Sequence, residues 1–222
     1  MFEVDHIPVW LTDRDRAVTM LAEATGLPIL EGFAPQGRRI ARGVRFGNGP
    51  FVDLHQADEE GPVFLGLGGD AHAAEAIARR SGWKARLTPH TAGGEPWTIL
   101  SFAPGQGLLS LLFVIQYATD DAAWSSPVFN GGLYHRPACG GAALTCVRLA
   151  AADRVRADAD LRALGFRADG DGRYRGGRAD LVLVDGEDAV LQVDVAAPGP
   201  SVRIPLGSQI AAAVGGHDSQ QG

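Results

Sequence analysis

The spacing of apolar residues predicts three short amphipathic helices. In residues 11–27, apolar side chains fall three and four positions apart and form one face. Residues 68–83 repeat that spacing, and residues 151–166 repeat it less regularly. Each stretch ends at a glycine, which can adopt the left-handed conformation that stops a helix, and a large apolar residue follows it. The three glycines are Gly26, Gly82 and Gly165.

Each predicted helix lies within the same order of strands. An apolar strand such as "FEVDHIPVWL" precedes it, and three strands follow, which in the last repeat are "RADGDGRYR", "ADLVLVD" and "AVLQVDVA". The sequence therefore predicts a β-α-β-β-β unit that occurs three times, in residues 1–60, 61–118 and 141–197. This pattern indicates an α+β fold in which each unit has an open apolar sheet face that needs cover.

Two further segments lie outside these units. Residues 119–140 contain three aromatic residues, which favours a packed linker or lid over a disordered tether. Residues 198–222 form a tail that includes a short strand, "SVRIPL", and that we expect to be partly disordered. An odd number of units leaves one sheet face open. Either these segments cover it, or two copies of the chain pair as a homodimer.

Composition and charge narrow the class of protein. The net charge is −6 and no run of Lys or Arg occurs, which argues against nucleic acid or a membrane surface as partner. No apolar run reaches the ~20 residues that span a bilayer, and the start of the chain lacks the pattern of a signal peptide. Two cysteines are too few for a disulfide framework. We therefore expect a soluble, cytoplasmic protein.

Two stretches, "DHIPVWLTDRDRA" and "VRFGNGPFVDL", together with the repeated strand order, resemble the vicinal oxygen chelate superfamily. This superfamily includes glyoxalase I, bleomycin-resistance proteins and ring-cleaving extradiol dioxygenases, and the chain looks most similar to its glyoxalase-like domain proteins. The resemblance implies that repeated β-α-β-β-β units pair into a cupped mixed sheet around a ligand cavity. Because the fold hosts many reactions, the function depends on the residues in that cavity.

The resemblance also implies where metal ligands would stand. Metal-using relatives place a histidine on the first strand of a unit and a glutamate on its fourth. His6 matches the first position, and Asp53 takes the place of the glutamate with a side chain that is one methylene shorter. His55 lies two residues further on, hence on the same face of the strand, and could serve instead.

The second unit departs from this ligand pattern. Pro62 or Val63 stands where a histidine is expected, and Gln116 replaces the glutamate. An amide oxygen is a weak ligand for Zn²⁺ or Fe²⁺.

The third unit departs from it as well. It offers Thr145 or Cys146 at the first position, depending on the alignment, and Gln192 at the fourth. The chain therefore holds either no metal or one divalent ion in a partial site. The candidate ligands for that ion are His6, Asp53, His55 and Gln116.

Aromatic residues provide a second set of candidates. Trp10 shares the strand face of His6, and Trp97 opens a strand of the second unit, so both could line an aromatic wall or belong to the core. A loop brings together His135 and Cys139, a combination that can form a nucleophilic pair. No recognisable catalytic motif surrounds them, so the pattern favours a structural linker.

We expect a metal-free protein that binds a small apolar or aromatic molecule. The alternative is a divalent-metal-dependent isomerase, lyase or dioxygenase that uses His6 with Asp53 or His55. The expected ligand-binding residues are Trp10, His6, Trp97 and Gln116.

Overall fold

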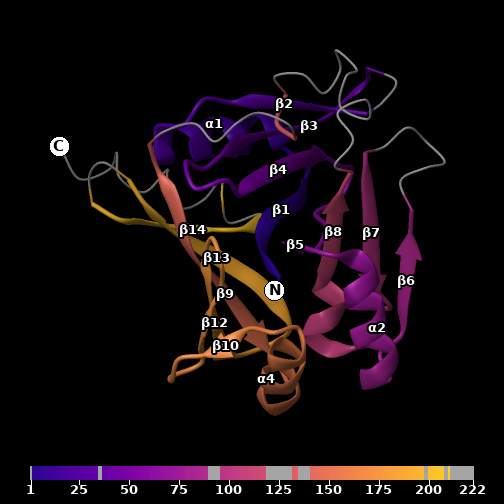
Figure 1. Ribbon diagram of the computed structural model, residues 1–222. Coiled ribbons are helices and arrows are strands. Elements are labelled where there is room, and N and C mark those ends of the chain that lie inside the picture. The colour runs from indigo at the N-terminus through magenta and orange to yellow at the C-terminus, as the bar shows by residue number, and fades with distance from the viewer. Residues whose placement is uncertain are drawn as a thin grey trace.

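The computed structural model describes residues 2–34, 37–89, 96–118, 132–134, 141–197, 200–207 and 210. These residues form two mixed β-sheets with helices packed on them, which confirms the α+β class (Figure 1). The strand order is β2-β3-β4-β1-β5-β8-β7-β6 in the first sheet and β10-β11-β12-β9-β13-β14 in the second. No helix among the described residues is long and apolar enough to cross a bilayer.

The first sheet consists of two β-α-β-β-β units placed side by side. The two central strands β1 and β5 run antiparallel, β1 pairs in parallel with β4, and β5 pairs in parallel with β8. The strands are β1 (Glu3–Leu11), β2 (Leu30–Phe33), β3 (Arg39–Arg45), β4 (Phe51–Gln56), β5 (Leu65–Gly68), β6 (Ala85–Thr88), β7 (Trp97–Phe102) and β8 (Leu112–Tyr117). A 3-10 helix, η2 (Gly107–Leu111), precedes β8.

The helices begin and end where the sequence pattern indicates. The side chains of Asp13, Asp70 and Asp153 accept hydrogen bonds from backbone N–H groups of the first helical turn. Gly26 and Gly82 end two of the helices in the left-handed conformation. The three helices are α1 (Arg14–Thr25), α2 (Ala71–Ser81) and α4 (Arg154–Ala163).

The second sheet differs from the strand assignment expected from the sequence. "RADGDGRYR" forms a hairpin of two short strands, β10 (Arg167–Ala168) and β11 (Arg173–Arg175), because Asp171 and its neighbouring glycines take left-handed conformations in a turn. β12 (Asp180–Asp185) therefore becomes the fourth strand of the third unit and pairs in parallel with β9 (Ala143–Ala151).

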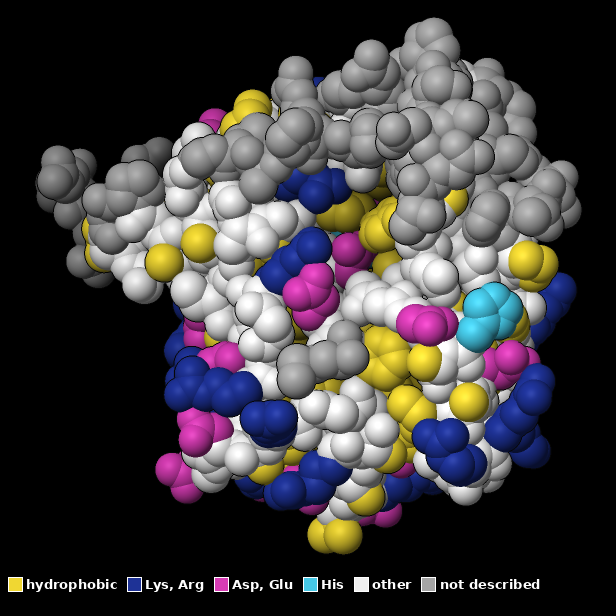
Figure 2. Space-filling view, in the orientation of Figure 1, with side chains coloured by type: hydrophobic (Ala, Val, Ile, Leu, Met, Phe, Trp, Pro, Cys, Tyr) yellow, Lys and Arg dark blue, Asp and Glu magenta, His cyan; other side chains and the backbone are white. Residues whose placement is uncertain are grey.

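"AVLQVDVA" was expected to be that fourth strand, and this prediction is wrong. It forms β13 (Ala189–Ala196), which pairs antiparallel with β9 as β5 pairs with β1. The tail strand β14 (Val202–Pro205) then pairs antiparallel with β13 and occupies the place that β8 has in the first sheet. The second sheet therefore contains one complete unit and counterparts of the first and last strands of another. Charged side chains of both signs are interspersed on its exposed surface (Figure 2).

The two sheets share one hydrophobic core. A single cluster of buried side chains includes residues of both sheets, among them Val9 and Leu67 of the first and Leu149 and Val193 of the second. Residues of the same chain therefore cover the inner side of the third unit. The homodimer was expected because that sheet face would be uncovered, and this reason no longer applies.

Polar contacts also join the sheets at the turn between β3 and β4. Asn48 donates from its amide to the carbonyl oxygens of Leu144 and Arg178, both at 2.7 Å, and accepts from the Leu144 N–H at 3.0 Å. Arg178 in turn forms an ion pair with Glu3 at the start of β1 (2.8 Å). This junction ties the beginning of β1 to the second sheet.

Candidate ligand-binding site

The first sheet encloses a cavity of about 360 Å³. Alternate residues of β1, β4, β7 and β8 point into it, as strand periodicity requires. Aromatic and aliphatic side chains make up most of its wall, and a few polar groups gather on β1 and β4. The principal lining residues are His6, Trp10, Phe51, Asp53, His55, Phe64, Trp97, Ile99, Phe113, Ile115, Tyr117 and Tyr134.

His6 is fixed by a hydrogen bond and by two aromatic rings. Its Nδ1 lies 2.7 Å from Asp5 Oδ2, and its ring stacks on Phe51 at a centroid distance of 4.7 Å. Phe113 contacts the same ring edge-on. The ring also needs Gly66 opposite it on β5, because a Cβ there would lie 2.8 Å from His6 Nδ1.

Asp5 connects His6 to the other half of the cup. Its Oδ2 also accepts a hydrogen bond from the hydroxyl of Tyr117 on β8 (2.6 Å). The register of β1 against β5 shifts between Val4 and His6, and this irregularity lies at Asp5 itself. Simple alternation along the strand would separate Asp5 from His6, whereas here the two side chains meet.

The pKa values of His6 and Asp5 are both shifted in the direction that favours an ion pair between them. Burial lowers the pKa of His6, but the hydrogen bond to Asp5 and the negative charges of Asp53 and Asp5 outweigh it, so the pKa lies above its usual value. Burial raises the pKa of Asp5, and the contacts with His6 and Tyr117 and the charge of Arg178 lower it by more. Burial and the charge of Asp5 raise the pKa of Tyr117, which keeps its hydroxyl protonated as a donor.

These shifts predict a pH-dependent stability. Because the folded-state pKa of His6 lies above 6.5, its stabilising contribution is complete below that pH and is lost as pH rises through the folded value. The contribution of Asp5 is complete above 3.8 and is lost on acidification. We therefore expect a lower Tm at pH 9 than at pH 6, measured by circular dichroism.

His6→Gln should remove most of this alkaline decrease. His72→Gln changes an exposed histidine of α2 and serves as the control. An unchanged pH dependence in His6→Gln would contradict the assignment.

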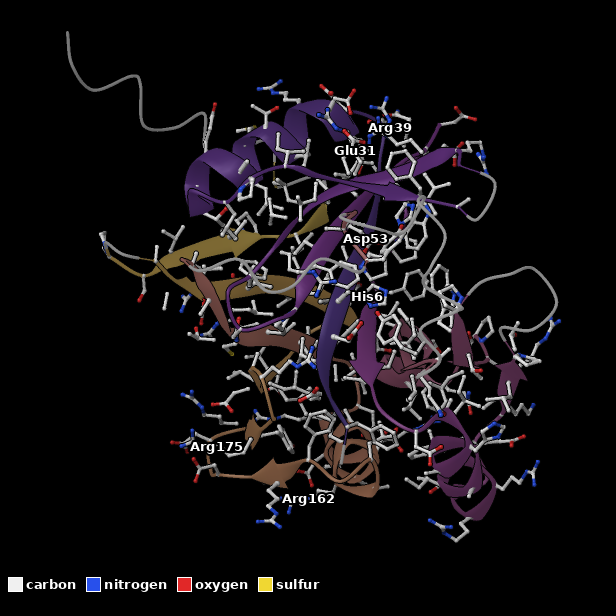
Figure 3. All side chains as sticks on the ribbon, turned by 45° about the horizontal axis from the view of Figure 1, so that its top comes forward. His6, Glu31, Arg39, Asp53, Arg162 and Arg175 are labelled. Atoms are coloured by element: carbon white, nitrogen blue, oxygen red, sulfur yellow. The ribbon has the colours of Figure 1, made fainter. Side chains whose placement is uncertain are left out.

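Asp53 stands beside His6 on the neighbouring strand β4 (Figure 3), and His55 lies two residues further along that strand. His55 Nε2 lies 3.0 Å from Asp53 Oδ2, and Trp10 stacks on the His55 ring at 4.8 Å. The other carboxylate oxygen of Asp53, Oδ1, is buried and has no hydrogen-bond partner. The pairing of β1 with β4 places Asp53 next to Pro8, one step along the cavity floor from His6.

A short segment between the sheets covers one side of the cavity. Tyr134 packs against Trp97 and Phe51, with ring centroids 5.8 and 5.9 Å away. Arg45 of β3 holds this segment through hydrogen bonds to the carbonyl oxygens of Leu133 and Tyr134. Burial and the charge of Asp53 raise the pKa of Tyr134, so its hydroxyl stays neutral. The other residues of the 119–140 segment lie outside the described part of the chain.

The strand register identifies which residues of the second unit correspond to His6 and Asp53. His6 pairs with Phe51 between β1 and β4, and Gly66 pairs with Phe113 between β5 and β8. The corresponding positions are therefore Gly66 and, two residues beyond Phe113, Ile115. The expectation of Pro62 or Val63 at the first position is wrong, because β5 begins only at Leu65.

The chain is similar to known proteins in structure, whereas the comparisons of its sequence gave no match. No family model matches the chain, and no curated protein matches its sequence. A hypothetical protein from Staphylococcus aureus superposes with a TM-score of 0.61 at 11% identity, over 90% of this chain and 93% of that one.

Two enzymes share the same architecture. The Mn(II)-bound glyoxalase from Novosphingobium aromaticivorans superposes with a TM-score of 0.56 at 17% identity over 87% of this chain. Homoprotocatechuate 2,3-dioxygenase from Arthrobacter globiformis gives 0.51 at 14% over 83%. The chain has the vicinal oxygen chelate fold. It spans 65% and 60% of these two enzymes.

The metal site that the vicinal oxygen chelate fold suggests does not fit the residues present here. No group of three or more His, Cys, Asp or Glu side chains in the described parts of the chain is placed to hold a metal ion. In the unit that should supply the second half of a ligand set, Gly66 has no side chain to offer, and the side chain of Ile115, which lines the cavity, is apolar.

Gln116 is separated from the other three candidate ligands. It lies between Ile115 and Tyr117 on β8 and points to the opposite face, where its Oε1 accepts a hydrogen bond from the Ala71 N–H at the start of α2 (2.9 Å). Its place at the cavity is taken by Tyr117. In the vicinal oxygen chelate fold of this chain, the glutamine therefore supports a helix instead of facing the cavity.

The candidates from the third unit lie in the second sheet, away from the cavity. Cys146 is buried, and burial with the charge of Asp194 raises the pKa of its thiol, while the hydroxyl of Thr145 donates to the Asp194 carbonyl. The amide of Gln192 lies on β13 between Arg148 and Arg203. His135 and Cys139 lie outside the described residues.

Several cavity residues were not predicted from the sequence. Phe51 lies two residues before Asp53, and Phe113 lies four residues before Tyr117. Each therefore shares a strand face with a residue that lines the cavity, and counting in steps of two would have found both. Tyr117 itself would have followed once Gln116 was placed on the other face. Asp5 had no such signal, because only the strand irregularity brings it to His6.

Proposed function

We propose that this protein binds a small, largely apolar aromatic molecule in the cavity of its first sheet. The observation that carries the proposal is the wall itself, in which aromatic rings from four strands and two connecting segments surround a space of about 360 Å³. Ligand sites commonly have volumes of about 300–1,000 Å³, apolar walls and a few convergent polar groups. This cavity has each of these properties.

The rings are fixed in position before any ligand arrives. Trp10 is held between His55, on which it stacks, and Phe64, which meets it edge-on at 5.6 Å. Trp97 is held by Tyr134, also edge-on. Rings that are already ordered lose little conformational entropy when a flat ligand packs between them, which favours binding.

The proposal predicts that N-phenyl-1-naphthylamine, a neutral fluorescent probe, binds with increased emission. Trp10→Leu should weaken that binding about 2- to 10-fold, which corresponds to the loss of one aromatic contact. Trp83 packs against Phe102 and does not line the cavity, so Trp83→Leu is the matched control and should bind the probe as the unmodified protein does.

Both variants are first checked for a folded circular dichroism spectrum. No saturable binding to the unmodified protein, or equal weakening in Trp10→Leu and Trp83→Leu, would contradict the proposed function.

A further inference from the structure

The second oxygen of Asp53 is an unusual feature of this cavity. Asp53 is only 3% exposed, and it lines the cavity from the centre of β4. Oδ2 contacts His55, whereas Oδ1 is buried without a hydrogen-bond partner. A buried carboxylate oxygen without a partner is costly, since water no longer solvates it and nothing replaces the lost hydrogen bonds. A ligand that brings a donor would remove this cost.

The closest described partner of the Asp53 carboxylate is the His55 ring. His6 forms its close pair with Asp5 at 2.7 Å and interacts with Asp53 only through its charge. Arg45 lies on β3 and donates hydrogen bonds to the backbone carbonyl oxygens of Gly49, Leu133 and Tyr134. Asp53 therefore has His55 as its one described side-chain partner, although it lies in a largely apolar cavity.

The aromatic wall favours the same kind of ligand. The faces of Trp and Tyr rings attract cations, and they do so more strongly when water is excluded. Trp10, Trp97 and Tyr134 all line the cavity that Asp53 enters from β4. A carboxylate at the floor and ring faces at the sides together suit a flat group that carries positive charge and N–H donors.

We propose that the ligand is a flat aromatic cation, of the amidinium or protonated aminoheteroaryl class, whose N–H group donates to the carboxylate of Asp53. This inference rests on the proposed function and specifies the chemistry of its ligand. The aromatic part lies between Trp10, Trp97 and Tyr134, and the charged end points to β4.

Three probes of equal shape test the charge requirement. 2-Naphthamidine, 2-naphthamide and 2-naphthoate carry charges of +1, 0 and −1 at pH 7.5 on the same ring system. Calorimetric titration is expected to give a preference for the amidine of about 10- to 100-fold over the amide, as for one hydrogen bond to a buried charged group. The naphthoate should bind most weakly.

Asp53→Asn should abolish the preference between amidine and amide while it leaves binding of the amide nearly unchanged. Asp185→Asn makes the same chemical change at an exposed site of the second sheet and should keep the preference. If all three probes bind the unmodified protein equally, the charge inference fails and the proposed function stands. If none of them binds and N-phenyl-1-naphthylamine does not bind either, the proposed function fails as well.

A metal ion is the competing occupant of Asp53. Untagged protein prepared without chelators is analysed for metal by mass spectrometry, with Asp53→Asn beside it. Stoichiometric divalent metal that disappears in the variant would overturn the inference. A ratio far below one ion per chain in both proteins supports it.

Discussion

Replacing Gly43 with alanine is expected to lower the free energy of unfolding by about 3 kcal/mol, as overpacking without room to relax does. Gly43 lies on β3 opposite Asp53. A Cβ at this position would overlap the backbone carbonyl oxygen of Val52 and would lie 2.9 Å from a methyl carbon of Leu133. The backbone oxygen cannot rotate away as a side chain could, so β3 and β4 would have to separate.

Gly26→Ala provides the comparison for this prediction. Gly26 has a φ of 67° with no atom within 4 Å of a built Cβ, so an alanine there costs only the strain of the left-handed conformation. That strain is about 1 kcal/mol. Urea unfolding followed by circular dichroism should give a much lower midpoint for Gly43→Ala than for Gly26→Ala. Equal midpoints would show that the strands tolerate the added methyl group.

Asp5→Ala should also cost about 3 kcal/mol, because removal of one partner from a buried pair leaves the other uncompensated. Asp5 accepts from both His6 and Tyr117, and all three side chains are at least half-buried. Without the carboxylate, the Tyr117 hydroxyl loses its acceptor, and His6 remains among Phe51 and Phe113 without its ion pair.

Asp5→Asn separates the loss of the hydrogen-bond acceptor for Tyr117 from the loss of the negative charge beside His6. The amide oxygen can still accept from Tyr117, but it carries no charge to favour protonated His6, so we expect a smaller loss of stability. The pKa of His6, followed by the NMR shift of its ring protons, should fall in both variants. A His6 pKa that stays unchanged in Asp5→Ala would contradict the pairing.

The sequence predicted the repeated framework because local signals determine it. Aspartate caps and left-handed glycines set the ends of α1 and α2, and the period-two alternation of β4 put Asp53 and His55 on one face. The face of Trp10 followed from His6 by the same count. These features depend on neighbours in the chain, so a pattern of residues is sufficient to place them.

What the sequence could not predict depends on register between distant strands. Gly66, not Val63, stands opposite Phe113, and this became clear only from the pairing of β5 with β8. Gln116 was expected to face the cavity, but one step along β8 reverses the side of the sheet on which a residue lies. Asp5 reaches His6 through a local irregularity that depends on the partner strand.

The unequal lengths of the two sheets bear on stoichiometry. In the described residues, β13 and β14 occupy the places of β5 and β8, but no counterpart of α2, β6 and β7 lies between them. A cup needs both halves, so the described residues form one complete cup, and we expect the protein to take up one equivalent of ligand. The repeat has thus increased the size of the scaffold without doubling its capacity.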